Sequence, residues 1–423
     1  MRYSDSNNRT MTSLLPVALH PRAAQLCIKH GKHLVTASYI SPSMRALHDP
    51  AVRAGVVLLN EIGLDPGIDH CSTHALLAQL RRDGKRVLSF SSFCGGFPAP
   101  ENVRGVPLGY KFSWTPRGVL GAALNGARFK LAGKLKEVEA HMLLREGLFP
   151  NVPVLSEQGI RLEGLPNRDS MPYVDTYGLG RLEVLRTVLR GTLRYPGFSN
   201  LMWGFRELGL LEAEKKVRVR DWAELVPAAL ASKVGDEAVL RVGAAEAVRK
   251  ALGEEELITS VLQAGQWLGI VGGGGGEGPK RPMPRVPRGE LAPIDLFAAL
   301  LGDRLRYEPR ERDMVVLSHE FVVTKENQPV EEEVYKSSLI AYGDPKEGGY
   351  TAMARTVGIP VAIAAMRVLD GKVGPAQGIV GVVGPSEPSV YQAVLDGLEK
   401  VGLGMIERRV RGIKTVEQTL AGY

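Results

Sequence analysis

Two strand–helix–strand units within residues 12–62 constrain the fold of this chain more than any other feature of its sequence. Each unit joins two short apolar runs through a stretch of helical length. In chain order, we expect a strand that ends at 13–15, a helix at 22–30, a strand at 33–39, a helix that begins at 42–48 and a strand at 56–59. Strands that alternate with helices at this spacing form a parallel sheet. The sequence therefore predicts an α/β fold.

The loop after the last of these strands is the first candidate for a ligand site. Residues 58–70 read LLNEIGLDPGIDH and place Asp65 between two glycines, with Asp69 and His70 just beyond. Ligands of open α/β sheets bind outside the carboxyl ends of the strands, so Asp65 is predicted to face a ligand crevice. The alternative is that Asp65 serves only an Asx turn before Pro66.

A second candidate is the run at 91–118, SSFCGGFPAPENVRGVPLGYKFSWTPRG. It gathers Cys94, two adjacent glycines, Tyr110, Lys111 and Trp114 into one segment. Glycines allow a ligand to approach the backbone closely, and an aromatic ring beside a cation can cover and orient a ligand. The composition of this run predicts a second ligand loop, with ordinary packing as the alternative for its aromatic and basic residues.

Charge and cysteine usage narrow the class of partner. The net charge is +7, but the basic residues are scattered and accompany no nucleic-acid-binding motif, so small anions are the expected ligands rather than nucleic acid. Three cysteines and eight histidines show no disulfide framework and no metal-ligand spacing. His70 and His74 would share a helix face, but no HExxH motif accompanies them. We therefore expect no metal.

The location is predicted from the absence of targeting patterns. The longest apolar runs are short and interrupted by proline or glycine, which predicts no membrane span. Residues 1–10 are polar and include an acidic residue, and the LLPVAL that follows is too short for a secretory core. These features favour a cytoplasmic protein, with a mitochondrial transit peptide as the alternative.

Several motifs go further than composition. EIGLDPGIDH, SSFCGGFPAPE and PLGYKFSW resemble motifs of the glutamate-forming saccharopine dehydrogenases, also called saccharopine reductases. Further matches follow in chain order: HLVTASYISP at 33–42, LPNRDS at 165–170, RGTLRYPGF at 190–198, ERDMVVL at 311–317 and GGYTAMARTVGIPVAIA at 348–364. The resemblance extends from about Leu14 to about Gly371, nearly the whole chain.

The resemblance implies a reaction, a cofactor and an assembly. Such enzymes interconvert saccharopine with L-glutamate and 2-aminoadipate 6-semialdehyde, with NADP(H) or NAD(H), in lysine metabolism by the α-aminoadipate pathway. They are expected to form homodimers. One rival is a catalytically inactive remnant that only binds or dimerises. Another is an enzyme that reduces other imines, such as a carboxyspermidine dehydrogenase, although the NRDS and GTLRY motifs speak against it.

The expected architecture is a partial Rossmann-type parallel sheet plus an α+β substrate and dimerisation domain with a helical insertion. Apolar residues at three- and four-residue steps predict helices at 199–211, 221–230, 236–252 and 254–268. The expected divisions are 1–64 for the nucleotide-binding part, 65–200 for the substrate domain, 201–305 for the helical subdomain with a Gly/Pro loop at 272–288, 306–350 for strands that rejoin the substrate domain, and 351–423 for a helix and a return toward the nucleotide-binding part. The tract Gly272–Gly276 is expected to be a flexible insertion rather than a phosphate loop.

The amino-terminal sequence carries an expectation of its own. No strand–GxGxxG–helix precedes residue 12, whereas the family resemblance implies first βαβ units that carry this dinucleotide fingerprint. The chain is therefore expected to start inside the Rossmann domain. The residues that choose between NADP and NAD follow the second strand of that fold, so this sequence does not reveal the choice.

The resemblance also implies roles for particular residues. The catalytic residues are expected to be Asp65, Tyr39 and Cys94. The substrate-binding residues are expected to be Ser38, Tyr39, Asp65, Arg168, Thr192, Leu193 and Arg194. The cofactor-binding residues are expected to be Leu14, Leu15, Pro16, Ser38, Gly63, Leu64, Asp65 and Trp114.

Each of these roles has a structural alternative. Arginine suits bidentate carboxylate recognition, but Arg168 and Arg194 could equally form structural ion pairs, with Asp169 as the nearest partner of Arg168. Cys94 could be a small buried apolar residue, and its role is the least defined of the three catalytic candidates. Trp114 could simply pack.

Overall fold

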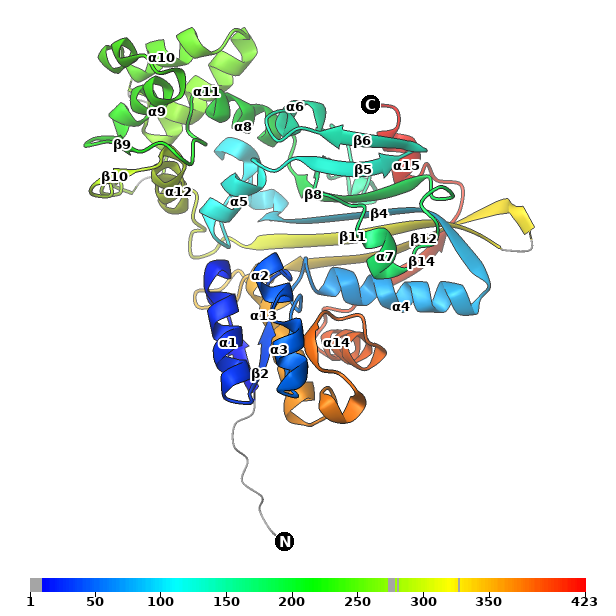
Figure 1. Cartoon of the computed structure of the whole chain (residues 1–423). Helices are drawn as coiled ribbons and strands as arrows, with labels where there is room; N and C mark the ends of the chain where they lie inside the picture. Colours follow the sequence, from blue (N-terminus) through cyan, green and yellow to red (C-terminus); the bar gives the residue numbers. More distant parts are fainter. Residues whose placement is uncertain (1–9, 273–277, 280, 326–327) are drawn as a thin grey trace.

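A four-stranded parallel sheet forms the amino-terminal part of the computed structural model, which describes residues 10–272, 278–279, 281–325 and 328–423 (Figure 1). Its strands, in spatial order, are β1 (Thr10–Ser13), β2 (His33–Thr36), β3 (Val57–Leu59) and β13 (Gly381–Val383). All three residues of β3 are buried, as expected of a strand covered on both faces. The predicted α/β units are confirmed, although β2 ends at Thr36 rather than at residue 39 and β3 begins at Val57 rather than at residue 56.

Five helices accompany this sheet. They are α1 (His20–Lys29), α2 (Pro42–Arg45), α3 (His48–Arg53), α13 (Ala352–Leu369) and α14 (Pro388–Lys400). The α2 helix starts where the sequence predicts it, because the side chain of Ser41 accepts a hydrogen bond from the Met44 amide and Pro42 occupies the first turn. Thr351 caps α13 in the same way through the Ala354 amide.

A second, eight-stranded sheet carries the rest of the candidate site. Its order is β14–β12–β11–β4–β8–β5–β6, with β7 also paired to β8, and β4 and β8 run parallel while the other pairs are antiparallel. The strands are β4 (Lys85–Pro98), β5 (Ala127–Leu131), β6 (Lys134–Val138), β7 (Glu163–Pro166), β8 (Thr187–Arg194), β11 (Asp313–Lys325), β12 (Gln328–Tyr342) and β14 (Ile406–Val410). Strand β4 alone spans 14 residues.

A helical subdomain lies at one end of this second sheet (Figure 1). It contains α8 (Phe198–Glu207), α9 (Leu225–Val234), α10 (Ala244–Ala251), α11 (Glu255–Leu268) and α12 (Pro293–Arg304), with the small sheet of β9 (Val217–Arg218) and β10 (Glu290–Leu291). The helix expected at 236–252 is instead a 3-10 turn, η6 (Glu237–Arg241), followed by α10, because Gly243 has extended backbone. The expectation of a flexible insertion at Gly272–Gly276 stays a prediction, because residues 273–276 lie outside the described part of the chain.

Shorter elements connect these parts. The helices α4 (Ile68–Arg82), α5 (Pro116–Ala122), α6 (Leu143–Glu146), α7 (Tyr173–Tyr177) and α15 (Val416–Leu420) complete the α-helices of the described residues. The remaining 3-10 turns are η1 (Val17–Leu19), η2 (Pro100–Asn102), η3 (Pro107–Gly109), η4 (Ser156–Gln158), η5 (Trp222–Glu224) and η7 (Pro375–Gln377).

The carboxy-terminal segment is divided between the two sheets. Strand β13 extends the parallel sheet, whereas β14 pairs with β12 and α15 contacts β4. Only part of the segment 351–423 therefore joins the parallel sheet. Among the described residues, α13 alone has the length and apolar composition of a membrane-crossing helix, with a mean hydropathy of 1.5. It contains Pro360 and packs here against β1, β2 and β11.

An apolar cluster joins the two sheets and determines where the site lies. It packs Val57 and Leu59 of the parallel sheet with Leu317 of β11, Leu339 of β12 and residues of α13. Burial of this cluster orients the carboxyl ends of β2 and β3 toward the second sheet. The loop between β3 and α4 is consequently held between the two sheets.

Candidate functional site

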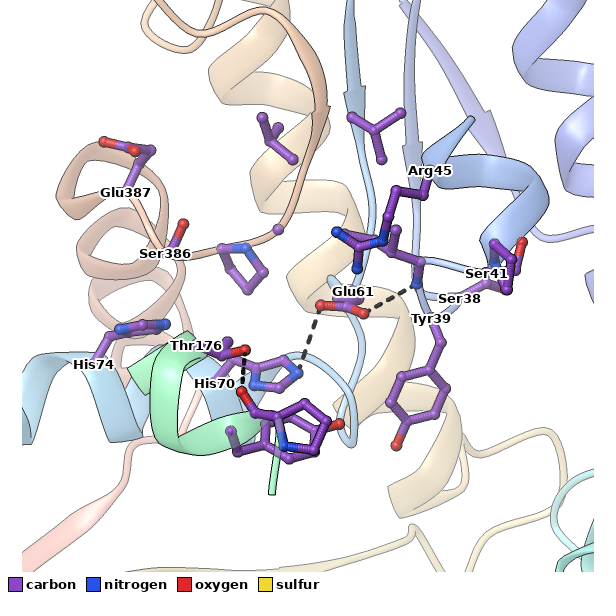
Figure 2. Close-up of a pocket in the computed structure, with 18 of the residues that line it drawn as sticks. Ser38, Tyr39, Ser41, Arg45, Glu61, His70, His74, Thr176, Ser386 and Glu387 are labelled. Carbon is purple, nitrogen blue, oxygen red and sulfur yellow. Dashed lines mark hydrogen bonds and ion pairs between the residues drawn. The ribbon is translucent and has the colours of Figure 1, made fainter. Parts of the chain in front are cut away.

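A pocket of about 910 Å³ lies beyond the carboxyl ends of β2, β3 and β13 (Figure 2). The parallel sheet contributes Ser38, Tyr39 and Glu61 to its wall. The second sheet and α7 contribute the side opposite, and the loop after β13 contributes Ser386 and Glu387. This is the position in which α/β sheets bind ligands, as the sequence predicts for the loop after β3.

The loop between β3 and α4 is wound tightly around two glycines. Gly67 has φ of 150°, and a Cβ atom there would lie 2.0 Å from the Gly63 carbonyl oxygen, so only glycine fits. The Gly67 amide donates to Asp69 Oδ1 at 2.5 Å. This turn places Asp65 and Asp69 on the side of the loop that faces the second sheet.

Asp65 is the centre of a buried polar cluster. Its Oδ1 accepts hydrogen bonds from the Tyr39 hydroxyl at 2.9 Å and from Arg190 Nη2 at 2.6 Å. Burial raises the pKa of the Asp65 carboxyl, and the nearby Arg190 guanidinium opposes that rise. Burial likewise raises the pKa of the Tyr39 hydroxyl well above its usual value, so Tyr39 stays protonated and donates. The sequence predicts Asp65 and Tyr39 as catalytic partners, and the structure brings them into contact.

Alternate residues of β8 form a row on the face of the second sheet that looks toward Asp65. Arg190, Thr192 and Arg194 share this face because successive side chains of a strand point to opposite sides. Cys94 of β4 is in register with Thr192 and belongs to the same row. Leu193 points the other way, into the main hydrophobic core, so the side chain of this expected substrate-binding residue does not face the row.

Arg194 is buried without a carboxylate partner among the described residues. Its guanidinium carbon lies 5.2 Å from the ring centre of Tyr110 and 5.1 Å from that of Phe198, and Nη1 donates to the Leu193 carbonyl. Its Nε has no hydrogen-bond partner. Buried cations are normally paired, so an anion at this position would relieve an electrostatic cost.

Arg168 occupies the pocket wall at the other end of the row. It is exposed, and its guanidinium carbon lies 5.8 Å from the ring centre of Tyr39. The alternative of an ion pair with Asp169 does not occur, because Asp169 approaches Arg128 at 3.8 Å instead. Arg168 has φ of 55°, a left-handed conformation that is uncommon for residues other than glycine and that recurs at functional sites.

Glu61 and His70 were not singled out as site residues by sequence reasoning, yet both line the pocket (Figure 2). Glu61 Oε1 accepts the Ile40 amide at 3.0 Å, and Oε2 lies 3.7 Å from His70 Nε2. Burial raises the pKa of Glu61 and lowers that of His70 well below its usual value. Glu61 also has φ of 60°. This strained backbone marks Glu61 as a candidate functional residue, and it can be recognised from the structure but not from the sequence.

Several expected cofactor residues lie outside the pocket wall. Leu14 and Leu15 are exposed, and the neighbouring Val17 lines the pocket in their place. Gly63 and Leu64 belong to the tight loop and do not line the pocket, and neither does Pro16. Trp114 is 40% exposed and donates to the Tyr110 hydroxyl. The structure thus brings Ser38 to the pocket but does not bring Trp114 there.

Two further residues lie in the motifs but receive no role from the resemblance. Arg190 and Asp69 form a buried contact of 2.6 Å at the base of the pocket. Arg190 lies two residues before Thr192, so the two-residue period of a strand was the signal that could have added it to the expected set. Among the described residues, no group of histidine, cysteine, aspartate and glutamate side chains has the arrangement of a metal site.

Comparison with known proteins agrees with the motifs. The model of the saccharopine dehydrogenase C-terminal domain family matches residues 63–403. The saccharopine dehydrogenase (NADP(+), L-glutamate-forming) of Schizosaccharomyces pombe is 34% identical over 93% of this chain and 83% of its own length, and that of Saccharomyces cerevisiae is 36% identical over 96% and 85%. The mitochondrial alpha-aminoadipic semialdehyde synthase of Mus musculus is 35% identical over 92% of this chain but only 39% of its own length.

A solved structure resembles the whole arrangement. The apo histidine-tagged saccharopine dehydrogenase (L-Glu forming) from Saccharomyces cerevisiae matches with a TM-score of 0.75 and 34% sequence identity, over 95% of this chain and 85% of that chain. The α/β fold predicted from the sequence is therefore confirmed at the level of the whole chain.

Proposed function

We propose a function from one premise: the chain belongs to the saccharopine dehydrogenase family. The proposed activity is that of an NADP-dependent oxidoreductase that interconverts saccharopine with L-glutamate and 2-aminoadipate 6-semialdehyde. Members of this family act in lysine metabolism, and the two yeast relatives carry NADP(+) in their names, which supports NADP(H) over NAD(H) here.

The set of charged side chains formed by Arg194, Arg168 and Asp65 is the observation that supports this proposal. Arg194 is a buried guanidinium without a carboxylate partner among the described residues, and Arg168 is an exposed guanidinium at the pocket wall. Asp65 accepts hydrogen bonds from Tyr39 and from Arg190, which belongs to the same row of β8 side chains as Arg194. Saccharopine has three carboxylates around one secondary amine. Two guanidinium groups for carboxylates and one carboxylate for the amine match that combination of charges.

The pocket suits the nicotinamide half of a dinucleotide. It lies outside the carboxyl ends of β2, β3 and β13, and its volume of about 910 Å³ accommodates more than one small ligand. Ser38 and Glu61 supply polar atoms at the ends of β2 and β3 that can bind ribose hydroxyls. When bound, the nicotinamide exchanges a hydride with the carbon next to the substrate nitrogen.

The chain's own residues then handle binding and protons. In the oxidative direction, Asp65 accepts the proton of the substrate ammonium on Oδ2, which accepts no hydrogen bond from the described part of the chain. Tyr39 donates to Oδ1 and keeps the carboxylate oriented. After water adds to the imine, Asp65 returns a proton to the leaving glutamate nitrogen. Burial raises the pKa of the Cys94 thiol well above its usual value, so Cys94 lines the substrate face as a neutral thiol.

The test combines binding and turnover in the full chain. NADPH and NADH are titrated by fluorescence, and saccharopine oxidation is measured in parallel. We expect NADPH to bind more tightly than NADH and saccharopine to be oxidised. A chain that binds neither dinucleotide and does not oxidise saccharopine would refute the proposal and favour a protein that only binds or dimerises.

The Arg168→Ala variant tests the substrate role of that arginine. Charge-assisted hydrogen bonds contribute about 1.5–3 kcal/mol, so KM for saccharopine should rise about 10–100-fold. Arg161→Ala, which removes an exposed arginine outside the pocket, is the matched control and should leave KM unchanged. An unchanged KM in Arg168→Ala would remove Arg168 from the substrate site.

Two further expectations belong to the same proposal. The homodimer and the cytoplasmic location rest on the family resemblance and on the absence of targeting patterns in the sequence. Analytical ultracentrifugation measures the first, and localisation of a tagged chain measures the second.

A further inference from the structure

Arg190 bridges two carboxylates at the base of the pocket. Its Nη2 lies 2.6 Å from Asp65 Oδ1 and 2.6 Å from Asp69 Oδ2, and its guanidinium carbon lies 4.1 Å from the ring centre of Tyr173. The Arg190 side chain is 4% exposed and that of Asp69 is 1% exposed. One cation therefore serves two anions in a dry environment, where charge interactions are strong.

Asp69 is fully engaged in this arrangement. Its Oδ1 accepts the Gly67 amide and its Oδ2 accepts Arg190. It also lies in the first turn of α4, where the helix favours negative charge. Asp65 is engaged through Oδ1 only and is 15% exposed. Asp69 thus has the environment of a permanent counterion, whereas Oδ2 of Asp65 accepts no hydrogen bond from the described residues.

We propose that Asp69 and Arg190 form a fixed buried ion pair that positions Asp65, holding its Oδ1 so that Oδ2 faces the substrate nitrogen. Arg190 and Asp69 are positioning residues in this proposal, since they act through Asp65. The proposal rests on the proposed function for its catalytic consequence, but the ion pair itself can be tested without turnover.

The charged groups around Asp65 determine the direction in which each substitution should shift the pKa of Asp65. The titratable and charged groups that face Asp65 are Tyr39 after β2, Asp69 and His70 of α4, Cys94 of β4, Tyr173 and Tyr177 of α7, and Arg190 of β8. Burial holds the pKa of His70 well below its usual value, so His70 does not supply a second cation. Arg190 lowers the pKa of Asp65, and Asp69 raises it.

Removing each partner should therefore move the pH profile in opposite directions. The acidic limb of kcat/KM for saccharopine oxidation reports the ionisation of the essential base in the free enzyme. In Asp69→Asn, we expect this limb to shift to lower pH, and in Arg190→Met to higher pH, each by about 1–3 units. Arg190→Lys should restore part of the shift. Arg117→Met, which removes an exposed arginine paired with Asp295, is the control and should leave the limb in place.

The contrary results are equally specific. Shifts of the same sign in both variants, or a higher KM without any shift, would overturn the proposal and make Arg190 a direct substrate ligand.

Unfolding in urea provides the second measurement. Arg190→Met leaves two buried carboxylates without a cation, so it should lose more stability at pH 8 than at pH 5, where the acids can be protonated. Equal losses at both pH values would overturn the ion pair. Absence of any turnover in the unmodified chain would refute the proposed function and leave this second test in force.

Discussion

His319 provides a prediction about stability whose size can be worked from the structure. The ring is fully buried on β11, with Nε2 2.8 Å from Ser72 Oγ and Nδ1 3.0 Å from Ser92 Oγ. Strand register places Ser92 between His319 and Arg190, so the three side chains form a row across β11, β4 and β8. A proton on His319 would add a second cation next to Arg190.

The magnitude follows from linkage. Burial, followed by the charge of Arg190, lowers the pKa of His319 from 6.5 to about 3. The unfolded chain binds this proton below about pH 6.5 and the folded chain does not, so the free energy of unfolding falls as the pH falls through that range. At pH 5 the lost contribution is about 2 kcal/mol, since each pH unit below 6.5 costs about 1.4 kcal/mol.

The assay compares the unmodified chain with His319→Gln. Glutamine can still donate to one serine hydroxyl and accept from the other, but it does not titrate. Urea unfolding is followed by far-UV circular dichroism at pH 8 and pH 5. The variant should lose about 2 kcal/mol less between these two pH values than the unmodified chain does. His141→Gln, which removes an exposed histidine, should behave like the unmodified chain. An equal acid loss in His319→Gln and the unmodified chain would show that His319 is not the buried titrating group.

Two other predictions concern the tight loop and the thiols. Gly67→Ala should destabilise the protein by about 3 kcal/mol or more in thermal unfolding and should abolish turnover, because the new Cβ would collide with the Gly63 carbonyl. Gly31→Ala is the control: there is open space around Gly31, so this substitution should cost only about 1–2 kcal/mol in the same assay. Cys27, Cys71 and Cys94 are all buried and burial raises the pKa of each, so Ellman's reagent at pH 8 should label them only after unfolding in urea; rapid labelling of the folded chain would contradict their burial.

The sequence predicts those helices and strands whose signals lie within the element itself. The alternation of β2, α2 and β3 could be derived from runs of apolar residues and from Pro42, because each element is short and its signals lie within it. The pairing of β4 with β11 joins residues more than 200 positions apart, from Asp313 with Pro98 to Lys325 with Lys85. No local pattern encodes such a pairing, so the second sheet had to be seen in the structure.

The residues of the candidate site also fall into those that the sequence predicts and those that only the structure reveals. Motif resemblance identified Asp65, Tyr39 and Arg194, because these lie in recognisable stretches of sequence. It also included Leu193, whose side chain faces the core, since a motif does not state which face of a strand each residue occupies. It left out Arg190, whose role depends on two carboxylates from another sheet. Charge pairing across sheets is a property of the folded chain, and sequence spacing alone does not contain it.

The bridge at Arg190 also bears on how a substrate reaches the site. Asp65 belongs to the loop after β3 and Asp69 to the first turn of α4, whereas Arg190 belongs to β8, so the two contacts of 2.6 Å connect the β3–α4 segment to the second sheet. A motion that separated the sheets here would break these contacts and would expose the apolar cluster that joins the sheets. Ser386, Glu387 and Arg168, which also line the pocket, are exposed. We therefore expect ligands to reach the pocket past these exposed residues rather than by separation of the two sheets.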